Sequence, residues 1–546
     1  MKNLKLTCLL LMACSFVSCN AQETSDSLED FGEAADLAVL AELENERMHY
    51  QLLRSQYQRG AALWSDFEAE LADFGEAQYE ALKPLILGAS IDQLQQAVDS
   101  GELSYETLTR FYLYRIRETE NDPARYLNAV ISLNPAALEL ARERDGGHGE
   151  NHDPIFGMPV LLKDNVGAAG MPTTAGAIAL AANETDNAFI AERLIERGAI
   201  VLGKANLSEW AYFFCGDCPS GWSAMGGQTL NPYGRLVFGT GGSSSGSGSA
   251  IAAEYAVAAV GSETSGSILS PASANSLIGL KPTTGSLSRT GVVPISATLD
   301  TTGPMARSVA DAVALFNAMT GYDEDDLAMP RLAEDLMLEY RLTGLSGKRL
   351  GLLESMTEDA FYQEAADLLA TDGATIEPVS FAWESPELFS EFLGAEMVRD
   401  LAAYLADHAG AGVEITSVSD LRAFNLEDPT RMPYGQAEVD MMAELDYGAE
   451  ELEALRAELQ SYARLQMENL FSQHDLDVLL SLNNMHAGVA ALANFPALTI
   501  PAGYRENGRP VGLTLIAPSF QEQVLIDIGA EFERLTMARR PAADYQ

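Results

Sequence analysis

Positive charge is scarce in this chain. Its 546 residues include 34 lysine and arginine residues against 79 aspartate and glutamate residues, which gives a formal net charge of −45. A surface of this sign repels a phosphate backbone, so we exclude DNA and RNA as partners. Two interpretations of the acidity stay open: a highly solvated surface, or one that recruits cationic ligands.

Most of the positive charge is arginine, so a lysine next to an apolar segment is unusual here. Lys163 is such a residue, because it follows the apolar run 155–162. The other lysines are Lys2, Lys5, Lys83, Lys204, Lys281 and Lys348.

Histidine is scarce as well, and the signatures of several common enzymes are missing. The chain has six histidines, no Gly-x-Ser-x-Gly after a clear strand, no His-Glu-x-x-His and no phosphate-binding Gly-x-x-x-x-Gly-Lys-Ser/Thr. These absences weigh against a Ser-His-Asp hydrolase, a zinc hydrolase and a nucleotide-binding enzyme. We therefore expect no cofactor and no metal.

Long apolar runs are absent too. The apolar stretch 6–17 follows Lys2 and Lys5 and is too short to span a bilayer, which is typical of a signal peptide. Cys19 lies just beyond it and resembles the acylated cysteine of a bacterial lipoprotein, so residues 1–19 are predicted to be a lipoprotein-type signal peptide. Acylation at Cys14 or ordinary cleavage near Ala21 are the alternatives. We expect an exported protein, periplasmic or anchored to the outer membrane, whose only membrane contact is this lipid.

Only two of the five cysteines lie beyond the leader. Cys215 and Cys218 form a C-x-x-C pair, and no further Cys or His cluster completes a tetrahedral zinc site. In an exported protein such a pair can form a small disulfide loop, and free thiols are the alternative.

The periodicity of apolar residues predicts an α/β protein. Residues 25–80 show helical spacing and are expected to form a helical N-terminal extension. The runs 155–162, 199–203, 497–501 and 511–516 have the length and composition of buried strands, and helical patterns alternate with the first two. The segment 250–260 is a helix candidate between Gly/Ser-rich loops. Residues 325–475 are charged and helical, as expected of a lid or outer layer.

Several ordered motifs resemble the amidase signature family. They begin with a segment like the family's G-x-P-x-x-x-K-D and continue through glycine- and serine-rich stretches to a G-L-K-P-T motif. In this sequence they are Gly157-Met158-Pro159-Val160-Leu161-Leu162-Lys163-Asp164, Gly241-Gly242-Ser243-Ser244-Ser245-Gly246-Ser247, Gly261-Ser262-Glu263-Thr264-Ser265-Gly266-Ser267 and Gly279-Leu280-Lys281-Pro282-Thr283.

The resemblance implies the amidase signature fold, with a large central mixed β-sheet flanked by helices on both faces. It places an amidase domain at 81–540, with the helical elaboration at about 325–475. It also implies that Ser267 is the nucleophile, that Ser243 is the serine held at a cis peptide and that Lys163 is the base. The backbone N–H groups of Thr264, Ser265, Gly266 and Ser267 match the family's oxyanion hole.

The chemistry of these residue types suits the implied roles. A serine hydroxyl is a weak nucleophile until a base removes its proton, and a lysine can do so only when burial lowers its pKa. Ser243 can donate and accept at once, so it can pass the proton between the other two. Asp164 would oppose the shift if it faced inward, and we expect it to face backbone donors or another partner.

The expected reaction is hydrolysis of a carboxamide through an acyl-enzyme. The family often has Arg two residues after the nucleophile, where this chain has Leu269, which weakens the case for small acidic amides. The motifs look most like those of bacterial peptide amidases, so C-terminal peptide amides are the expected substrates. Hydrolysis of fatty or aryl amides or of esters, and a non-catalytic binding lipoprotein on the same scaffold, are the alternatives. Nothing in the sequence indicates an oligomeric state.

Overall fold

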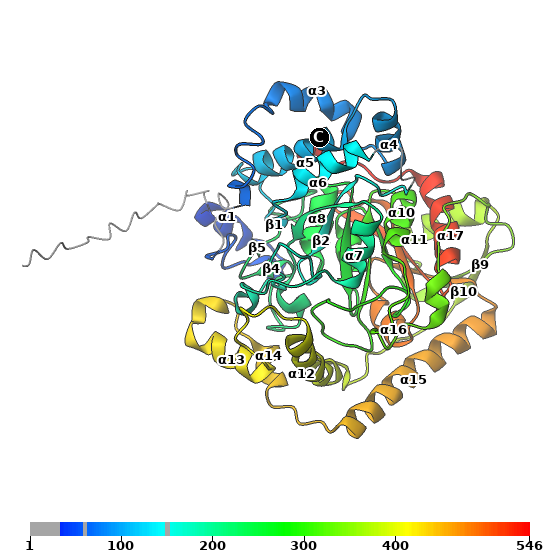
Figure 1. The fold of residues 1–546 in the computed structure, drawn as a ribbon. Helices are drawn as coiled ribbons and strands as arrows, with labels where there is room; N and C mark the ends of the chain where they lie inside the picture. The colour runs from blue at the N-terminus through cyan, green and yellow to red at the C-terminus, as the bar shows by residue number, and fades with distance from the viewer. Residues whose placement is uncertain (1–32, 58–62, 148–152) are drawn as a thin grey trace, which may run out of the picture.

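The computed structural model describes residues 33–57, 63–147 and 153–546. An eleven-stranded sheet runs through the molecule in the order β1-β3-β2-β6-β8-β7-β12-β13-β11-β9-β10 (Figure 1). Its strands are β1 Val130–Leu133, β2 Pro159–Lys163, β3 Ile200–Ala205, β6 Ala258–Glu263, β7 Ile278–Lys281, β8 Thr301–Ala306, β9 Arg349–Leu353, β10 Thr375–Val379, β11 Val478–Leu482, β12 Ala497–Tyr504 and β13 Pro510–Ile516. A separate hairpin pairs β4 (Trp222–Ser223) with β5 (Gly227–Gln228).

The sheet is mixed. Strand β2 is parallel to both β3 and β6, and β9 is parallel to β10 and β11, whereas the other neighbouring pairs are antiparallel. The helices are α1 Glu33–Leu40, α3 Glu76–Ile86, α4 Ile91–Asp99, α5 Tyr105–Glu120, α6 Ala137–Gly146, α7 Phe189–Glu196, α8 Ser245–Ala252, α9 Leu269–Ala274, α10 Val309–Met319, α11 Ala360–Thr371, α12 Phe389–Asp407, α13 Val418–Glu427, α14 Ala437–Met442, α15 Ala449–His474, α16 Ala487–Leu492 and α17 Glu522–Thr536.

Helices cover both faces of the sheet, as the side chains of β12 show. Thr499 shares a hydrogen bond of 3.0 Å with Ser273 of α9. Its neighbours Leu498 and Ile500 lie instead against Gly529 of α17. Because successive side chains of a strand point to opposite faces, α9 and α17 lie on opposite sides of the sheet. The predicted α/β architecture with a mixed sheet is confirmed.

The Gly/Ser-rich region folds differently from the sequence prediction. The predicted helix at 250–260 is wrong: α8 begins at Ser245 and ends at Ala252, and residues 258–263 form β6. All eight residues of α8 are buried, and a methyl group on Gly246 would lie 2.4 Å from Asn206 N. Glycine and serine therefore form this helix because only small side chains let it pack so closely, a tertiary effect that overrides low helix propensity.

The two regions outside the motif-bearing core differ in structure. In the N-terminal extension, the described residues between α1 and α3 are mostly turns and bends, with a short 3₁₀ helix at Glu46–Met48 and helical residues at 63–64. Residues 325–475 contain α11 to α15, but they also supply β9 and β10 to one edge of the sheet. Figure 1 shows α12 to α15 gathered on the side of the molecule opposite α3 to α6.

The predicted lipidation site, Cys19, lies outside the described residues. Within the part of the chain that the structure describes, no helix combines the length and apolar character needed to cross a bilayer.

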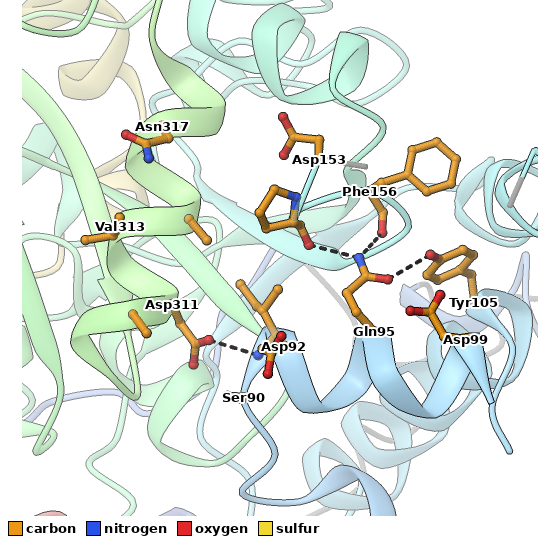
Figure 2. Close-up of a pocket in the computed structure, with 14 residues that line it drawn as sticks. Ser90, Asp92, Gln95, Asp99, Tyr105, Asp153, Phe156, Asp311, Val313 and Asn317 are labelled. Carbon is orange, nitrogen blue, oxygen red and sulfur yellow. Dashed lines mark hydrogen bonds between the residues drawn. The ribbon is translucent and has the colours of Figure 1, made fainter. Parts of the chain in front are cut away.

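A cavity of about 520 Å³ lies between α4, the turn at 153–156 and α10 (Figure 2). Gln95 spans it, donating to the carbonyl oxygens of Pro154 and Phe156 and accepting from the hydroxyl of Tyr105. None of the predicted catalytic residues lines this cavity.

Candidate active site

Lys163 ends β2 in a fully buried position. Its ammonium nitrogen Nζ lies 2.7 Å from Ser243 Oγ and 2.9 Å from Ser262 Oγ, and it donates to the Ser262 carbonyl oxygen at 3.1 Å. Burial lowers the pKa of Lys163 to about 7, against the opposing effect of the charges on Asp300 and Glu263. A substantial fraction of this amine is therefore neutral, and able to accept a proton, at neutral pH.

Ser243 is held at the start of α8 by its backbone. The Gly242–Ser243 peptide bond is cis, and the Ser243 carbonyl oxygen accepts a hydrogen bond of 3.0 Å from Ser208 N. The following serines make loop hydrogen bonds: Ser244 Oγ donates to the Ser262 carbonyl and Ser245 Oγ to the Gly241 carbonyl. With its side chain buried, Ser243 presents Oγ to Lys163.

Ser267 lies in the turn between β6 and α9 and is partly exposed. Because β2 and β6 are parallel neighbours, the end of β6 brings this turn to the same sheet edge as Lys163. The Ser267 carbonyl accepts from Ser244 N at 3.1 Å, which ties the turn to the loop of Ser243. Among the described residues no hydrogen bond joins the two hydroxyls of Ser243 and Ser267.

The same turn presents free backbone donors. Within the described part of the chain, the N–H groups of Ser265, Gly266 and Ser267 donate to no protein acceptor. Gly266 has a φ of 91°, a left-handed value that favours glycine. The next two amides, of Ile268 and Leu269, are instead bound by Glu263 Oε2 at 2.7 and 3.0 Å. This arrangement fixes the turn and leaves its preceding N–H groups available to a developing oxyanion.

Asp164 points away from its neighbour Lys163. Its carboxylate accepts from the backbone N–H and hydroxyl of Thr174 and lies 3.5 Å from Lys204 Nζ, and both charged side chains are fully buried. Lys204 also donates to Thr173 Oγ1 at 3.0 Å. The negative charge next to the predicted base is thus compensated by another partner.

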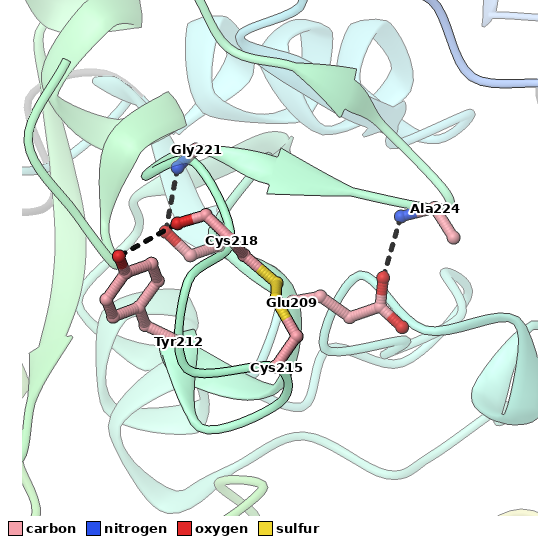
Figure 3. Close-up of a disulfide and its surroundings, with 7 residues drawn as sticks. Glu209, Tyr212, Cys215, Cys218, Gly221 and Ala224 are labelled. Carbon is pink, nitrogen blue, oxygen red and sulfur yellow. Dashed lines mark hydrogen bonds between the residues drawn. A yellow bond between two sulfur atoms is a disulfide. The ribbon is translucent and has the colours of Figure 1, made fainter. Parts of the chain in front are cut away.

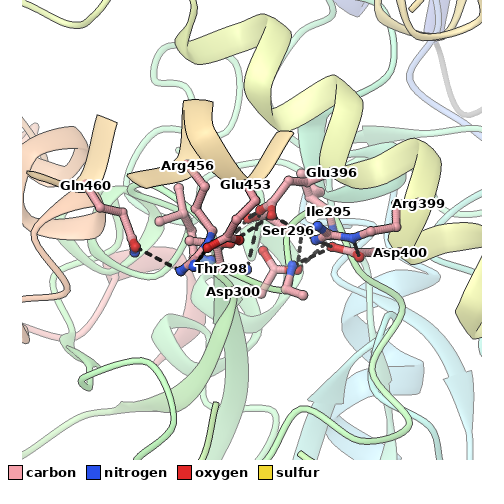
Figure 4. A network of polar contacts seen from close by, with 12 residues as sticks. Ile295, Ser296, Thr298, Asp300, Glu396, Arg399, Asp400, Glu453, Arg456 and Gln460 are labelled. Atoms are coloured by element: carbon pink, nitrogen blue, oxygen red, sulfur yellow. Dashed lines mark hydrogen bonds and ion pairs between the residues drawn. The ribbon is translucent and has the colours of Figure 1, made fainter. Parts of the chain in front are cut away.

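The turn is also connected to α12, in the 325–475 region, by the polar network of Figure 4. Thr264 Oγ1 donates to one oxygen of Asp300, and the backbone amides of Ile295 and Ser296 donate to the other at 2.8 and 2.9 Å. Burial raises the pKa of Asp300 to about 6. Glu396 of α12 is fully buried and accepts from the Ser296 hydroxyl. The residues labelled in the figure are Ile295, Ser296, Thr298, Asp300, Glu396, Arg399, Asp400, Glu453, Arg456 and Gln460.

Two residues near the predicted base were not predicted from the sequence to belong to the site. Ser262 contacts Lys163 Nζ through both its hydroxyl and its carbonyl, and Asp300 acts on the charge of Lys163. Ser262 lies inside a motif, five residues before Ser267. Its contact with Lys163 depends on how β6 pairs with β2, and the sequence alone does not give that register. No motif around Asp300 indicates that it belongs to the site, because it reaches Lys163 from a loop distant in the sequence.

Figure 3 shows the disulfide between Cys215 and Cys218 in the loop that follows Ser208. The Tyr212 hydroxyl donates to the Cys218 carbonyl at 2.8 Å, and Gly221 N donates to Ser208 Oγ at the same distance. Through the amide of Ser208, this loop also contacts the carbonyl of Ser243. The disulfide therefore closes a loop that supports the candidate site.

Comparison with known proteins places the chain in one family. A family model described as Amidase matches residues 107–487. A probable amidase from Arabidopsis thaliana is 36% identical over 477 residues, covering 83% of this chain and 91% of the plant protein. An amidase family protein from Bacillus anthracis superposes with a TM-score of 0.85 at 36% identity, covering 90% of this chain and 99% of that one.

The peptide amidase of Stenotrophomonas maltophilia is similar as well. Its crystal structure superposes with a TM-score of 0.79 at 38% identity, covering 84% of this chain and 98% of that one. The residues that the family model matches include Lys163, Ser243 and Ser267. The chain therefore belongs to the amidase signature family and is an amidase, a hydrolase that acts on amides.

Proposed function

We propose that this amidase removes ammonia from C-terminal peptide amides, with Ser267 as nucleophile, Ser243 as proton relay and Lys163 as base. The observation that carries the proposal is the buried contact of 2.7 Å between Lys163 Nζ and Ser243 Oγ. A lysine whose pKa lies near neutrality can take a proton from a serine hydroxyl, which an ordinary surface lysine cannot do.

In the first half of the reaction, Ser267 Oγ attacks the carbonyl carbon of the substrate amide. Its proton passes to Ser243 Oγ, and the proton of that hydroxyl passes to Lys163 Nζ. The carbonyl oxygen becomes an oxyanion, which the free N–H groups of Ser265, Gly266 and Ser267 stabilise. When the C–N bond breaks, Ser243 gives its proton to the leaving nitrogen and regains one from Lys163, so that the nitrogen leaves as ammonia and Lys163 is neutral again.

In the second half of the reaction, water is the nucleophile that attacks the acyl-enzyme. Its proton follows the same relay to Lys163 while its oxygen attacks the ester carbonyl of the acyl-enzyme. Collapse of the second tetrahedral intermediate breaks the bond to Ser267 Oγ, releases the carboxylic acid and returns the proton to Ser267. The relay is thus regenerated without an external base.

Two observations support a peptide amide as substrate. Leu269, two residues after the nucleophile, is uncharged and fully buried, so this position supplies no cation for a small acidic amide. The similarity to a peptide amidase extends over most of both chains at 38% identity. The expected export of the protein would also separate it from the cytoplasmic partners that amidation of charged transfer RNA requires.

A substrate panel tests this choice. Ammonia release is measured from amidated peptides, from fatty amides and from aryl amides under one set of conditions. We expect the peptide amides to react with the highest kcat/KM. Reaction of the fatty or aryl amides alone would show that the peptide assignment is wrong while leaving the amidase reaction in place.

We also propose that the protein is exported and anchored through Cys19. The leader pattern of Lys2, Lys5 and the apolar stretch 6–17 supports this, and a disulfide at Cys215–Cys218 suits an oxidising compartment. Incorporation of labelled palmitate should be lost in Cys19→Ala and kept in Cys14→Ala. Equal labelling of Cys19→Ala and wild type would contradict the anchor.

A further inference from the structure

The turn of Ser267 is bordered by the start of α16. A methyl group placed on Gly266 would lie 3.1 Å from Asn484 Nδ2 and 3.3 Å from Ala487 Cβ. Asn484 and Met485 are exposed, and 64% of Met485 is accessible to solvent. Residues 484–487 therefore lie beside the turn that carries the nucleophile.

Trp383 reaches the same place from the segment between β10 and α12. A methyl group placed on Gly488 would lie 3.7 Å from Trp383 Nε1 and 3.8 Å from Ser265 Oγ. The indole and the hydroxyl thus lie next to the same small space beside α16. Trp383 is partly buried and packs against the core, which holds its ring in place.

Two further aromatic contacts adjoin this surface. The ring of Tyr462, on α15, lies 5.5 Å from that of Trp383, and the ring of Phe381 lies 6.3 Å from that of His486. Tyr462 is 45% exposed. We call Trp383, Tyr462 and Met485 the rim cluster. Met485 belongs to the segment 484–487 that borders the Ser267 turn, Trp383 lies beside Gly488 near Ser265 Oγ, and Tyr462 packs against Trp383.

The chemistry of the rim cluster suits a bulky apolar group. Apolar and aromatic side chains that are accessible beside a partly exposed nucleophile are typical of a binding surface. Methionine adapts its shape to different apolar partners.

We infer that the rim cluster is the specificity subsite for the substrate residue that bears the carboxamide, and that it selects aromatic and large aliphatic side chains. This inference rests on the proposed function. A primary carboxamide loses only ammonia, so everything bulky in a peptide amide lies on the acyl side of the bond that breaks. The side chain nearest the reacting carbonyl therefore falls beside the Ser267 turn, where the rim cluster lies.

The test compares dipeptide amides that differ only in the last residue, Phe, Leu, Gly or Asp. Wild type should hydrolyse the Phe and Leu amides with a higher kcat/KM than the Gly and Asp amides. Trp383→Ala should lower kcat/KM for the Phe amide by about 10-fold or more, in line with the cost of losing part of an apolar pocket, and change the Gly amide less than about twofold. Trp383→Phe should keep most of the preference.

Tyr462→Ala provides a second variant, because this exposed side chain is removed with little cost to the fold. It should also reduce the ratio of the Phe to the Gly amide. Tyr340→Ala is the matched control: its side chain is 44% exposed in the segment before β9, and the ratio should not change.

The outcomes separate this inference from the proposed function. Equal losses on all four amides in both variants would show that Trp383 and Tyr462 only support the fold, and would overturn the subsite. Wild-type activity without a preference for bulky residues would overturn it as well, while the peptide-amide assignment stood. Failure of wild type on every peptide amide would overturn both.

Discussion

Lys163 Nζ lies 2.7 Å from Ser243 Oγ, although 80 residues separate the two along the chain. The contact forms where β2 ends and α8 begins, and burial there gives Lys163 a pKa of about 7. Removing the amine from water is thus the physical step that turns an ordinary lysine into a candidate base.

The first prediction concerns pH. Lys163 acts as a base only when neutral, so kcat/KM should rise as the pH increases through about 7 and level off above it. A profile of kcat/KM against pH for a peptide amide measures this limb. The substrate should carry no group that titrates between pH 5 and 9. A kcat/KM that stays constant over this range would argue against a lysine base.

Asp300→Asn should shift the pH range over which kcat/KM rises. The negative charge of Asp300 raises the pKa of Lys163, so its removal should lower that pKa and shift the rising limb to lower pH. The activity should also fall, because Asp300 accepts from Thr264 in the turn. Asp400→Asn is the matched control, since Asp400 belongs to the same network and binds Ala297 N. An equal shift in both variants would mean that the network acts through structure alone.

Gly266→Ala tests the turn. The φ of 91° is strained for alanine, and its Cβ would lie 3.1 Å from Asn484 Nδ2, so the turn should shift and misplace its N–H groups. We expect kcat to fall by about 100-fold, in the range for losing one oxyanion donor, with a smaller change in KM.

Gly508→Ala is the control for backbone strain alone. Gly508 has a φ of 88° in the connection between β12 and β13, and a methyl group there would touch nothing within 4 Å. Its kcat should match wild type. A similar loss in both variants would mean that strain, and not the oxyanion turn, causes the effect.

Lys204→Met tests the buried pair beneath the site. Removing this cation leaves Asp164 buried without its partner, which typically costs about 3–5 kcal/mol. The midpoint of urea unfolding should fall, and the double variant Asp164→Asn/Lys204→Met should recover part of the loss. Lys348→Met, whose partly exposed pair with Asp477 spans 3.9 Å, should change the stability by less than about 1 kcal/mol. Equal effects of the two single variants would contradict the role of burial.

The α/β class and the strand that ends at Lys163 could be predicted from the sequence, because an apolar run of strand length is recognised from neighbouring residues alone. The prediction misplaced the helix now seen at Ser245–Ala252, because glycine and serine are poor helix formers and only close packing against Asn206 explains their state. The implied triad came from ordered motifs. Ser262 and Asp300 could not be predicted, since their contacts depend on strand register and on a distant loop.

Covalent labelling by a serine-directed fluorophosphonate, located by mass spectrometry of the digested protein, tests most directly whether Ser267 is the nucleophile. If Ser267 is the nucleophile and Lys163 its base, we expect a single labelled peptide containing Ser267 and no label in Ser267→Ala. In a folded Lys163→Ala, labelling at neutral pH should be slowed by at least about 100-fold, since general bases contribute factors of about 10²–10⁴. Absence of label in wild type, or equal label in Ser267→Ala, would contradict this assignment.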